Sequence, residues 1–207
     1  MPERQSPAAR ADRSAFPWRA FAPLGALVCF TMLVFYLIPT RLPFFLAAIG
    51  IESPSAAGVA IVAVTLAGIP GSFWFGRIRA RFAAMTVAWA CFLIVAVGFV
   101  LISLADSLPG VVLGTFVVGA GLGPAIPNLL AWLMASMPDE AKGRASGYFT
   151  VALFGGQFLS PLVAQAVSGR VGLARTFDAF AAALAAMAIA LFVLGRLGAR
   201  RAGAARG

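Results

Sequence analysis

The amino-acid sequence predicts an all-α membrane protein, a bundle of six transmembrane helices. Apolar residues make up 61% of the 207 residues and charged residues 11%, and the mean hydropathy is +0.95. A soluble domain is about 45–50% apolar and about 25% charged. Six apolar stretches follow one another along the chain, each long enough to cross a bilayer, which takes about 20 helical residues. The solvent for most of this chain is therefore lipid.

The first three stretches are predicted as helices over Ala20–Leu46, Ser55–Gly76 and Phe82–Leu104. Each is bounded by charged or turn residues, and none shows the period-two alternation of a membrane strand. The first is longer than a bilayer requires and contains Pro39 and Pro43, which predicts a kinked or tilted helix.

The last three stretches are predicted as helices over Leu108–Met137, Gly143–Val167 and Leu173–Leu197. The fourth helix again exceeds the minimum length and contains Pro124 and Pro127, which predicts a kinked or tilted helix here too. If the bundle is two inverted three-helix repeats, the two proline-interrupted helices occupy corresponding positions. Interrupted helices at corresponding positions indicate a transport site.

Three segments make up the predicted domain organisation: a basic tail or linker over 1–19, a transmembrane domain over 20–197, and a basic tail over 198–207. Thirteen of the 16 basic residues fall on the side of the two termini, and the other side keeps Arg41, Arg170 and Arg175. The positive-inside rule then predicts a multi-pass protein of the inner (plasma) membrane with both termini in the cytoplasm. Because the arginines lie in short segments between apolar runs, the net charge of +9 indicates membrane topology and no nucleic-acid partner.

The residue types that are missing exclude several function classes. The chain has no histidine, which excludes imidazole bases and imidazole metal ligands, so we expect no enzyme activity, no metal and no cofactor. The run from Gly119 to Pro124 is glycine-rich, but neither the strand nor the soluble helix of a dinucleotide site flanks it. A channel is disfavoured, since Arg77, Arg79 and Arg81 are spaced by two in an expected loop and no Asn-Pro-Ala turn occurs.

Polar side chains inside the spans are few, and helical spacing places them on shared faces. A buried amide in lipid needs a partner or water, so Asn128 and Gln157 should face a cavity or, alternatively, hold helices together. Small residues predict close approach of neighbouring helices. They are Ala63, Ala67 and Gly71, with Gly68, Ser72 and Gly76 alongside, in the second stretch, and Gly119 and Gly123 in the fourth. The shared faces are Leu33, Tyr36, Thr40 and Pro43; Gly121, Pro124, Asn128 and Trp132; and Thr150, Phe154, Gln157 and Pro161.

Three stretches give the chain a family resemblance. They are LIPTRLPFFL ending at Leu46; GRIRARF from Gly76, similar to a degenerate G-x-L-a-D-R-x-G loop with Gly76, Ile78 and Arg81 in place; and GAGLGPAIPN from Gly119, continued by KGRASG and FGGQFLSP to Pro161. From about residue 21 to 197 the chain resembles the second six-helix half of a major facilitator superfamily transporter, closest to bacterial exporters of drugs and small molecules.

This resemblance implies export of small amphipathic molecules, with antiport as the family mode, by alternating access between two six-helix halves. The implied partners are lipid, a small-molecule substrate and a second half, from the same or a different chain; the alternative is a truncated or split-gene remnant without independent activity. The expected substrate contacts are Tyr36, Asn128, Phe154 and Gln157. The expected gating or structural residues are Pro39, Arg41, Pro43, Gly76, Arg81, Gly119, Gly123, Pro124, Pro127, Arg144 and Pro161.

Overall fold

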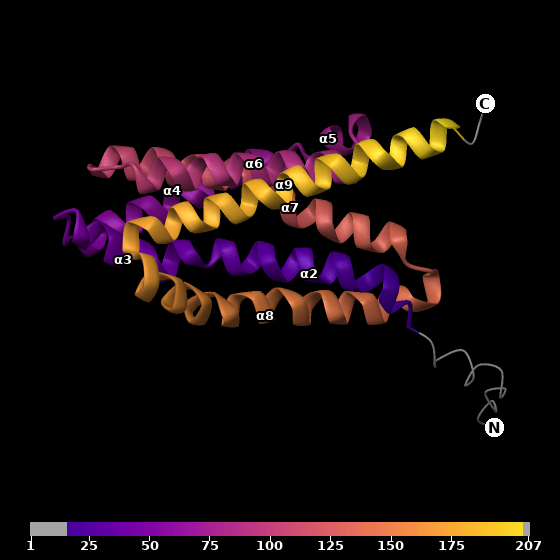
Figure 1. Ribbon diagram of the computed structural model, residues 1–207, viewed down its shortest axis with the longest axis horizontal. Helices are drawn as coiled ribbons and strands as arrows, with labels where there is room; N and C mark the ends of the chain where they lie inside the picture. The colour runs from indigo at the N-terminus through magenta and orange to yellow at the C-terminus, as the bar shows by residue number, and fades with distance from the viewer. Residues whose placement is uncertain (1–15, 205–207) are drawn as a thin grey trace, which may run out of the picture.

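The structure is a computed structural model that describes residues 16–204, with side chains to residue 198. The described residues form helices without strands (Figure 1). Six spans among them are long and apolar enough to cross a membrane, which confirms the predicted six-helix bundle. The helices are α2 (Trp18–Phe35), α3 (Leu37–Ala48), α4 (Pro54–Phe73), α5 (Phe75–Arg81), α6 (Ala84–Ser103), α7 (Leu108–Ser136), α8 (Asp139–Val171) and α9 (Leu173–Ala204).

The first span is divided into α2 and α3 at Tyr36. Pro39 has no backbone N–H, so the carbonyl of Phe35 loses its usual helical partner. The hydroxyl of Thr40 donates to the Tyr36 carbonyl at 2.5 Å, beside the interruption. The proline-containing first span is therefore interrupted at Tyr36, whereas α7 runs unbroken through Pro124 and Pro127.

The helices of the structure differ from the predicted segments at three places. The segment of Arg77, Arg79 and Arg81, expected as a loop, is the short helix α5. Helix α8 begins at Asp139, four residues before the predicted start, because acidic residues in its first turn favour the positive helix terminus. Helix α9 continues beyond residue 197 to Ala204, into the expected tail. The expected amino-terminal tail lies outside the described residues up to position 15.

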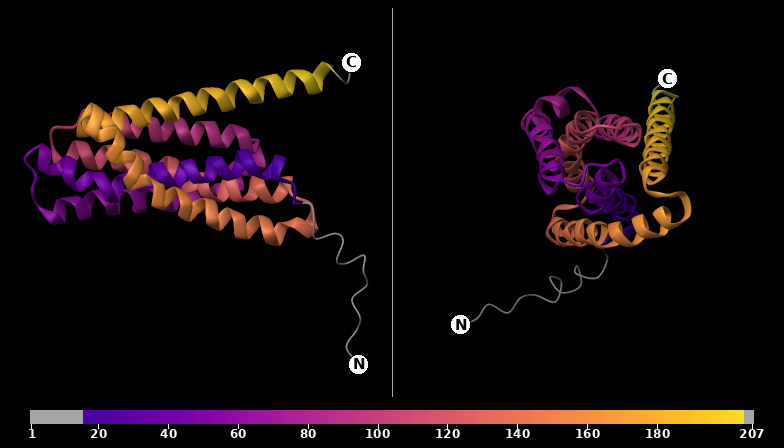
Figure 2. Two further views of the ribbon diagram at one scale, coloured as in Figure 1. Left: turned by 60° about the horizontal axis from the view of Figure 1, so that its bottom comes forward. Right: turned by 90° about the vertical axis from the view of Figure 1, so that its left-hand side faces the viewer.

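Helix α7 packs against α6 and α4, α6 packs against α9, and α2 packs against α8 (Figure 2). Glycine makes these approaches possible. A methyl group at Gly119 would overlap the Val64 carbonyl, and one at Gly123 would overlap the Gly68 carbonyl. The predicted small-residue packing of the second and fourth spans is thus confirmed.

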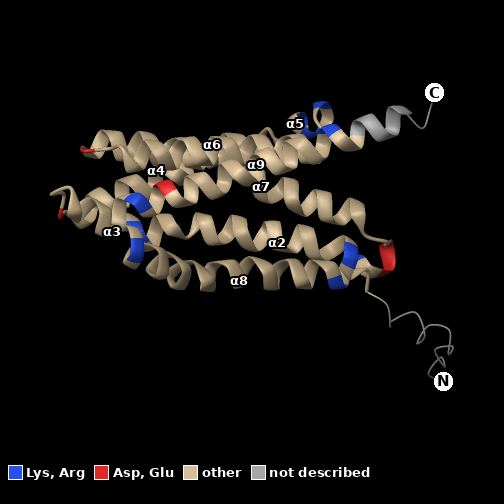
Figure 3. Ribbon diagram, viewed as in Figure 1, with Lys and Arg blue, Asp and Glu red and all other residues tan. Residues whose placement is uncertain are grey.

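Charged side chains of the described residues gather at the two ends of the bundle (Figure 3). The first and last described residues lie at the same end (Figure 1). This end carries the basic residues of α5, of the start of α8 and of the later part of α9, while those of α3, of the end of α8 and of the start of α9 lie at the other. The long middle of the bundle is apolar, as a membrane core of about 30 Å requires.

Candidate functional site

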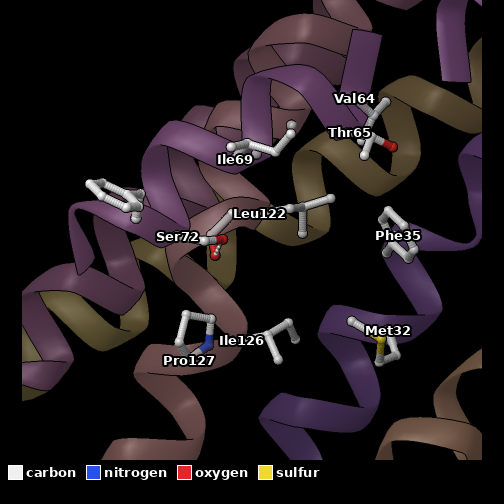
Figure 4. Close-up of a pocket in the computed structure, with 13 residues that line it drawn as sticks. Met32, Phe35, Val64, Thr65, Ile69, Ser72, Leu122, Ile126 and Pro127 are labelled. Carbon is white, nitrogen blue, oxygen red and sulfur yellow. Dashed lines mark hydrogen bonds between the residues drawn. The ribbon is translucent and has the colours of Figure 1, made fainter. Parts of the chain in front are cut away.

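The candidate site is a groove of about 740 Å³ between α2, α4 and α7 (Figure 4). Its floor is the close contact of α4 with α7, where three glycines bring the two backbones together. Side chains from all three helices form the walls. The lining residues are Met32, Phe35, Val64, Thr65, Gly68, Ile69, Ser72, Phe73, Gly119, Leu122, Gly123, Ile126 and Pro127.

Only two of these lining side chains are polar, and both are occupied by helix backbone. The Ser72 hydroxyl donates to the Gly123 carbonyl at 2.8 Å, and the Thr65 hydroxyl to the Ile61 carbonyl at 3.5 Å. The groove therefore offers mainly apolar surface, which is the usual character of a small-molecule pocket. Among the described residues, no group of His, Cys, Asp or Glu could hold a metal ion.

Gln157 reaches the groove wall from α8. Its amide Nε2 lies 3.8 Å from the Sδ of Met32, which lines the groove. A thioether sulfur is a weak acceptor, so this partner is easily exchanged. Gln157 is not itself a lining residue, and among the expected substrate contacts it is the one with a polar contact to a lining side chain.

Asn128 lies outside the groove lining, in the contact between α7 and α6. Its side chain is fully buried, and its Nδ2 donates to the Ala84 carbonyl at 2.9 Å. Its Oδ1 is buried without a hydrogen-bond partner among the described residues. This placement corresponds to the alternative in which the amide holds two helices together.

The other two expected contacts also lie outside the lining. Tyr36 is half-buried at the α2–α3 junction, with its ring edge-on to Phe35, which does line the groove, at a centroid distance of 5.6 Å. Phe154 is 60% exposed on α8. The structure thus does not bring the four residues together around one cavity.

Two of the expected gating residues meet at the end of the bundle opposite the termini. A guanidinium nitrogen of Arg41 on α3 donates to the Pro161 carbonyl at 3.2 Å and to Gln165 Oε1 at 2.9 Å, both on α8. Nε of Arg41 is buried without a hydrogen-bond partner in the described part. This interaction ties α3, the second part of the first span, to α8.

At the end that carries the termini, Arg144 of α8 lies over the Phe16 ring, with its guanidinium carbon 5.6 Å from the ring centroid. Phe16, Trp18 and Tyr148 pack edge-on or tilted with centroids within 5 Å. This aromatic cluster joins the start of α2 to α8. Aromatic rings of this amphipathic kind favour the membrane interface.

Some of the remaining expected gating residues line the groove, one packs between helices, and the others are exposed. Gly119, Gly123 and Pro127 line the groove. Pro124 packs closely against Gly71 of α4, since a methyl group added to Gly71 would lie 2.7 Å from the Cδ of Pro124. Exposed positions are occupied by Pro39, Pro43, Gly76 and Arg81.

Most groove residues were not singled out by sequence reasoning. Gly68 and Ser72 belong to the small-residue run of the second span, and that run was the available signal. Ile69, Phe73 and Ile126 resemble lipid-facing side chains in the sequence, because any apolar residue in a span has the same composition signal.

Comparison with known proteins agrees with this architecture. The family model of the Major Facilitator Superfamily matches residues 2–161. A crystal structure of the POT-family transporter PepTSo shares the fold, with a TM-score of 0.71 and 20% identity over 88% of this chain and 38% of that chain. The chain thus spans well under half of that solved transporter, and no curated protein matches the sequence. Because the family match spans most of its length, the chain belongs to the Major Facilitator Superfamily.

Proposed function

We propose that this chain is one half of a secondary transporter that exports small amphipathic molecules by alternating access. The observation that carries the proposal is the apolar groove of about 740 Å³ between α2, α4 and α7. Its volume lies within the range of about 300–1,000 Å³ typical of small-molecule sites. Its scarcity of free polar groups suits apolar and amphipathic substrates better than sugars or anions.

A second six-helix half, from this or another chain, would supply the missing wall of the groove. Helix α4 leaves Ile69 58% exposed and Phe73 80% exposed beside it. A large apolar surface on a membrane protein is covered by lipid or by protein. The POT-family structure, of which this chain covers 38%, supports an assembly longer than this chain.

The proposed setting is the inner membrane with both termini in the cytoplasm. In this orientation, the contact of Arg41 with α8 lies at the outer end, and Arg144 with its aromatic neighbours lies at the cytoplasmic end. We propose that these two contacts steady α8 against the first span at opposite gates. The Pro39–Pro43 segment, at the break between α2 and α3, supplies the hinge.

The test is dye transport into inside-out vesicles, with ethidium as an amphipathic cation. The full chain is reconstituted alone and together with the six-helix product of an adjoining reading frame. We expect accumulation by the assembled pair, abolished by Ile69→Trp, which fills the groove, and retained by Leu113→Trp, an exposed position outside the lining. Absence of transport in every combination would establish the alternative, a remnant without independent activity.

A further inference from the structure

A second groove, of about 560 Å³, lies between α6 and α9 at the end of the bundle where α9 finishes. Its apolar wall includes Trp89 and Phe192, whose rings meet edge-on with centroids 5.4 Å apart. The groove is open because position 195 is glycine. A Cβ there would lie 3.2 Å from the Sδ of Met85 on the facing helix.

The mouth of this groove carries a positive charge. Arg196 lines it, with the guanidinium carbon 5.1 Å from the centroid of the Phe192 ring. Within the described part of the chain, no carboxylate lies within ion-pair distance of this guanidinium. The uncapped first turn of α6, which includes Thr86, lines the same groove and adds partial positive charge. Groove and arginine together are complementary to an anion with an apolar tail.

The exposed surface of α6 and α9 beyond the groove is apolar. Val97 on α6 is 49% exposed and Ile189 on α9 is 62% exposed. The same two helices form another groove, of about 430 Å³, toward the other end, and its charged lining residue is Asp178. A carboxylate repels an anionic headgroup, so the two grooves differ in the lipid charge they accept.

We propose that the α6–α9 groove at Arg196 binds an anionic phospholipid, with its phosphate on Arg196 and an acyl chain along Trp89 and Phe192. An anionic lipid matches both features of the groove, because its phosphate suits the arginine and its acyl chain suits the apolar wall. The membrane around the bundle supplies such lipids. The site is separate from the substrate groove and requires only that the chain spans the membrane.

Quenching of Trp89 by brominated lipid tests the proposal. Full-length protein that retains Trp89 alone, with Trp18, Trp74 and Trp132 changed to Phe, is reconstituted in phosphatidylcholine containing phosphatidylglycerol. The bromine label is placed on one lipid and then on the other. We expect phosphatidylglycerol to be enriched about fivefold at Trp89 relative to its bulk fraction, as one basic residue near the surface allows.

Arg196→Gln should remove the enrichment, whereas Arg19→Gln, an exposed arginine at the same end, should retain it. Gly195→Leu fills the groove and should reduce quenching by both lipids. The proposal is overturned if brominated phosphatidylglycerol quenches Trp89 no more than its bulk fraction predicts. It is also overturned if both arginine variants lose the enrichment equally. Shielding of Trp89 from both lipids in the unmodified groove overturns it as well, since a second protein chain would then cover the groove.

Discussion

At the scale of single residues, the two amides within the spans have different surroundings. Gln157 is half-buried, and its amide donates to the weak acceptor Met32 Sδ at 3.8 Å. Asn128 is fully buried and bonded to the Ala84 carbonyl at 2.9 Å. A substrate contact must exchange its partner for ligand, whereas a packing contact keeps its partner. The surroundings therefore favour Gln157 for binding and Asn128 for holding α6 to α7.

We expect Gln157→Leu to reduce ethidium transport by the assembled protein about fivefold, the effect of losing one hydrogen bond of about 1 kcal/mol. The amount of protein in the membrane should stay unchanged, because no strong internal bond is lost. Ser168→Ala on the same helix is the control, since that hydroxyl bonds its own helix at Gln165. Loss of the folded population in Gln157→Leu would instead assign this amide to helix packing.

Asn128→Ala should lower the free energy of unfolding by about 1–2 kcal/mol, because the bond to α6 and its packing are lost. Unfolding in mixed micelles measures this change. Transport per folded molecule should be retained. A variant that folds as well as the parent but no longer transports would return Asn128 to the role of a substrate contact.

Sequence reasoning identified both amides as inward-facing, but it could not separate their roles. Helical spacing fixes which residues share a face, and it does not fix which neighbouring helix that face meets. Asn128 and Pro127 are adjacent in the chain, yet Pro127 lines the groove and Asn128 bonds the other neighbour. That distinction depends on the packing of α7 between α4 and α6.

At the scale of helices, the six spans were predictable and their ends were not. Hydropathy identifies a span through some twenty consecutive residues. It does not separate a charged loop from a charged helix, and α5 carries three arginines in seven residues. The start of α8 was missed for the same reason, since Asp139 and Lys142, an ion pair at 2.6 Å, look like loop residues in a hydropathy profile.

The contact of α4 with α7 depends on glycine. Gly119→Ala should lower the free energy of unfolding by about 1–3 kcal/mol, because the new methyl overlaps the Val64 carbonyl and forces the helices apart. Gly155→Ala is the matched control: a Cβ added there would have nothing within 4 Å, and alanine favours a helix by about 0.5–1 kcal/mol. Equal stability changes in the two variants, measured by denaturant unfolding, would show that α4 and α7 do not meet at Gly119.

At the scale of the whole molecule, charge determines how the bundle sits in the membrane. Among the described residues, the basic side chains at the end with the termini outnumber the acidic ones. The basic residues are Arg19, Arg196, the arginines of α5, Lys142 and Arg144, and the acidic ones are Asp139 and Glu140. At the other end, Arg41, Arg170 and Arg175 are matched by Glu52, Asp106 and Asp178. Basic loops stay in the cytoplasm during insertion. The six spans then return the chain to the side from which it started.

Reporter fusions test this orientation. A fluorescent protein fused after Gly207 should fold and fluoresce in the cytoplasm, while alkaline phosphatase fused at Asp106, in the turn between α6 and α7, should be active outside it. Replacing Arg77, Arg79 and Arg81 with glutamine should weaken the preference for this orientation, because these residues are a large part of the excess of basic residues at the end that carries the termini. A phosphatase active at Gly207 and silent at Asp106 would reverse the bundle. The Arg41 contact would then lie on the cytoplasmic side and the lipid groove at Arg196 in the outer leaflet.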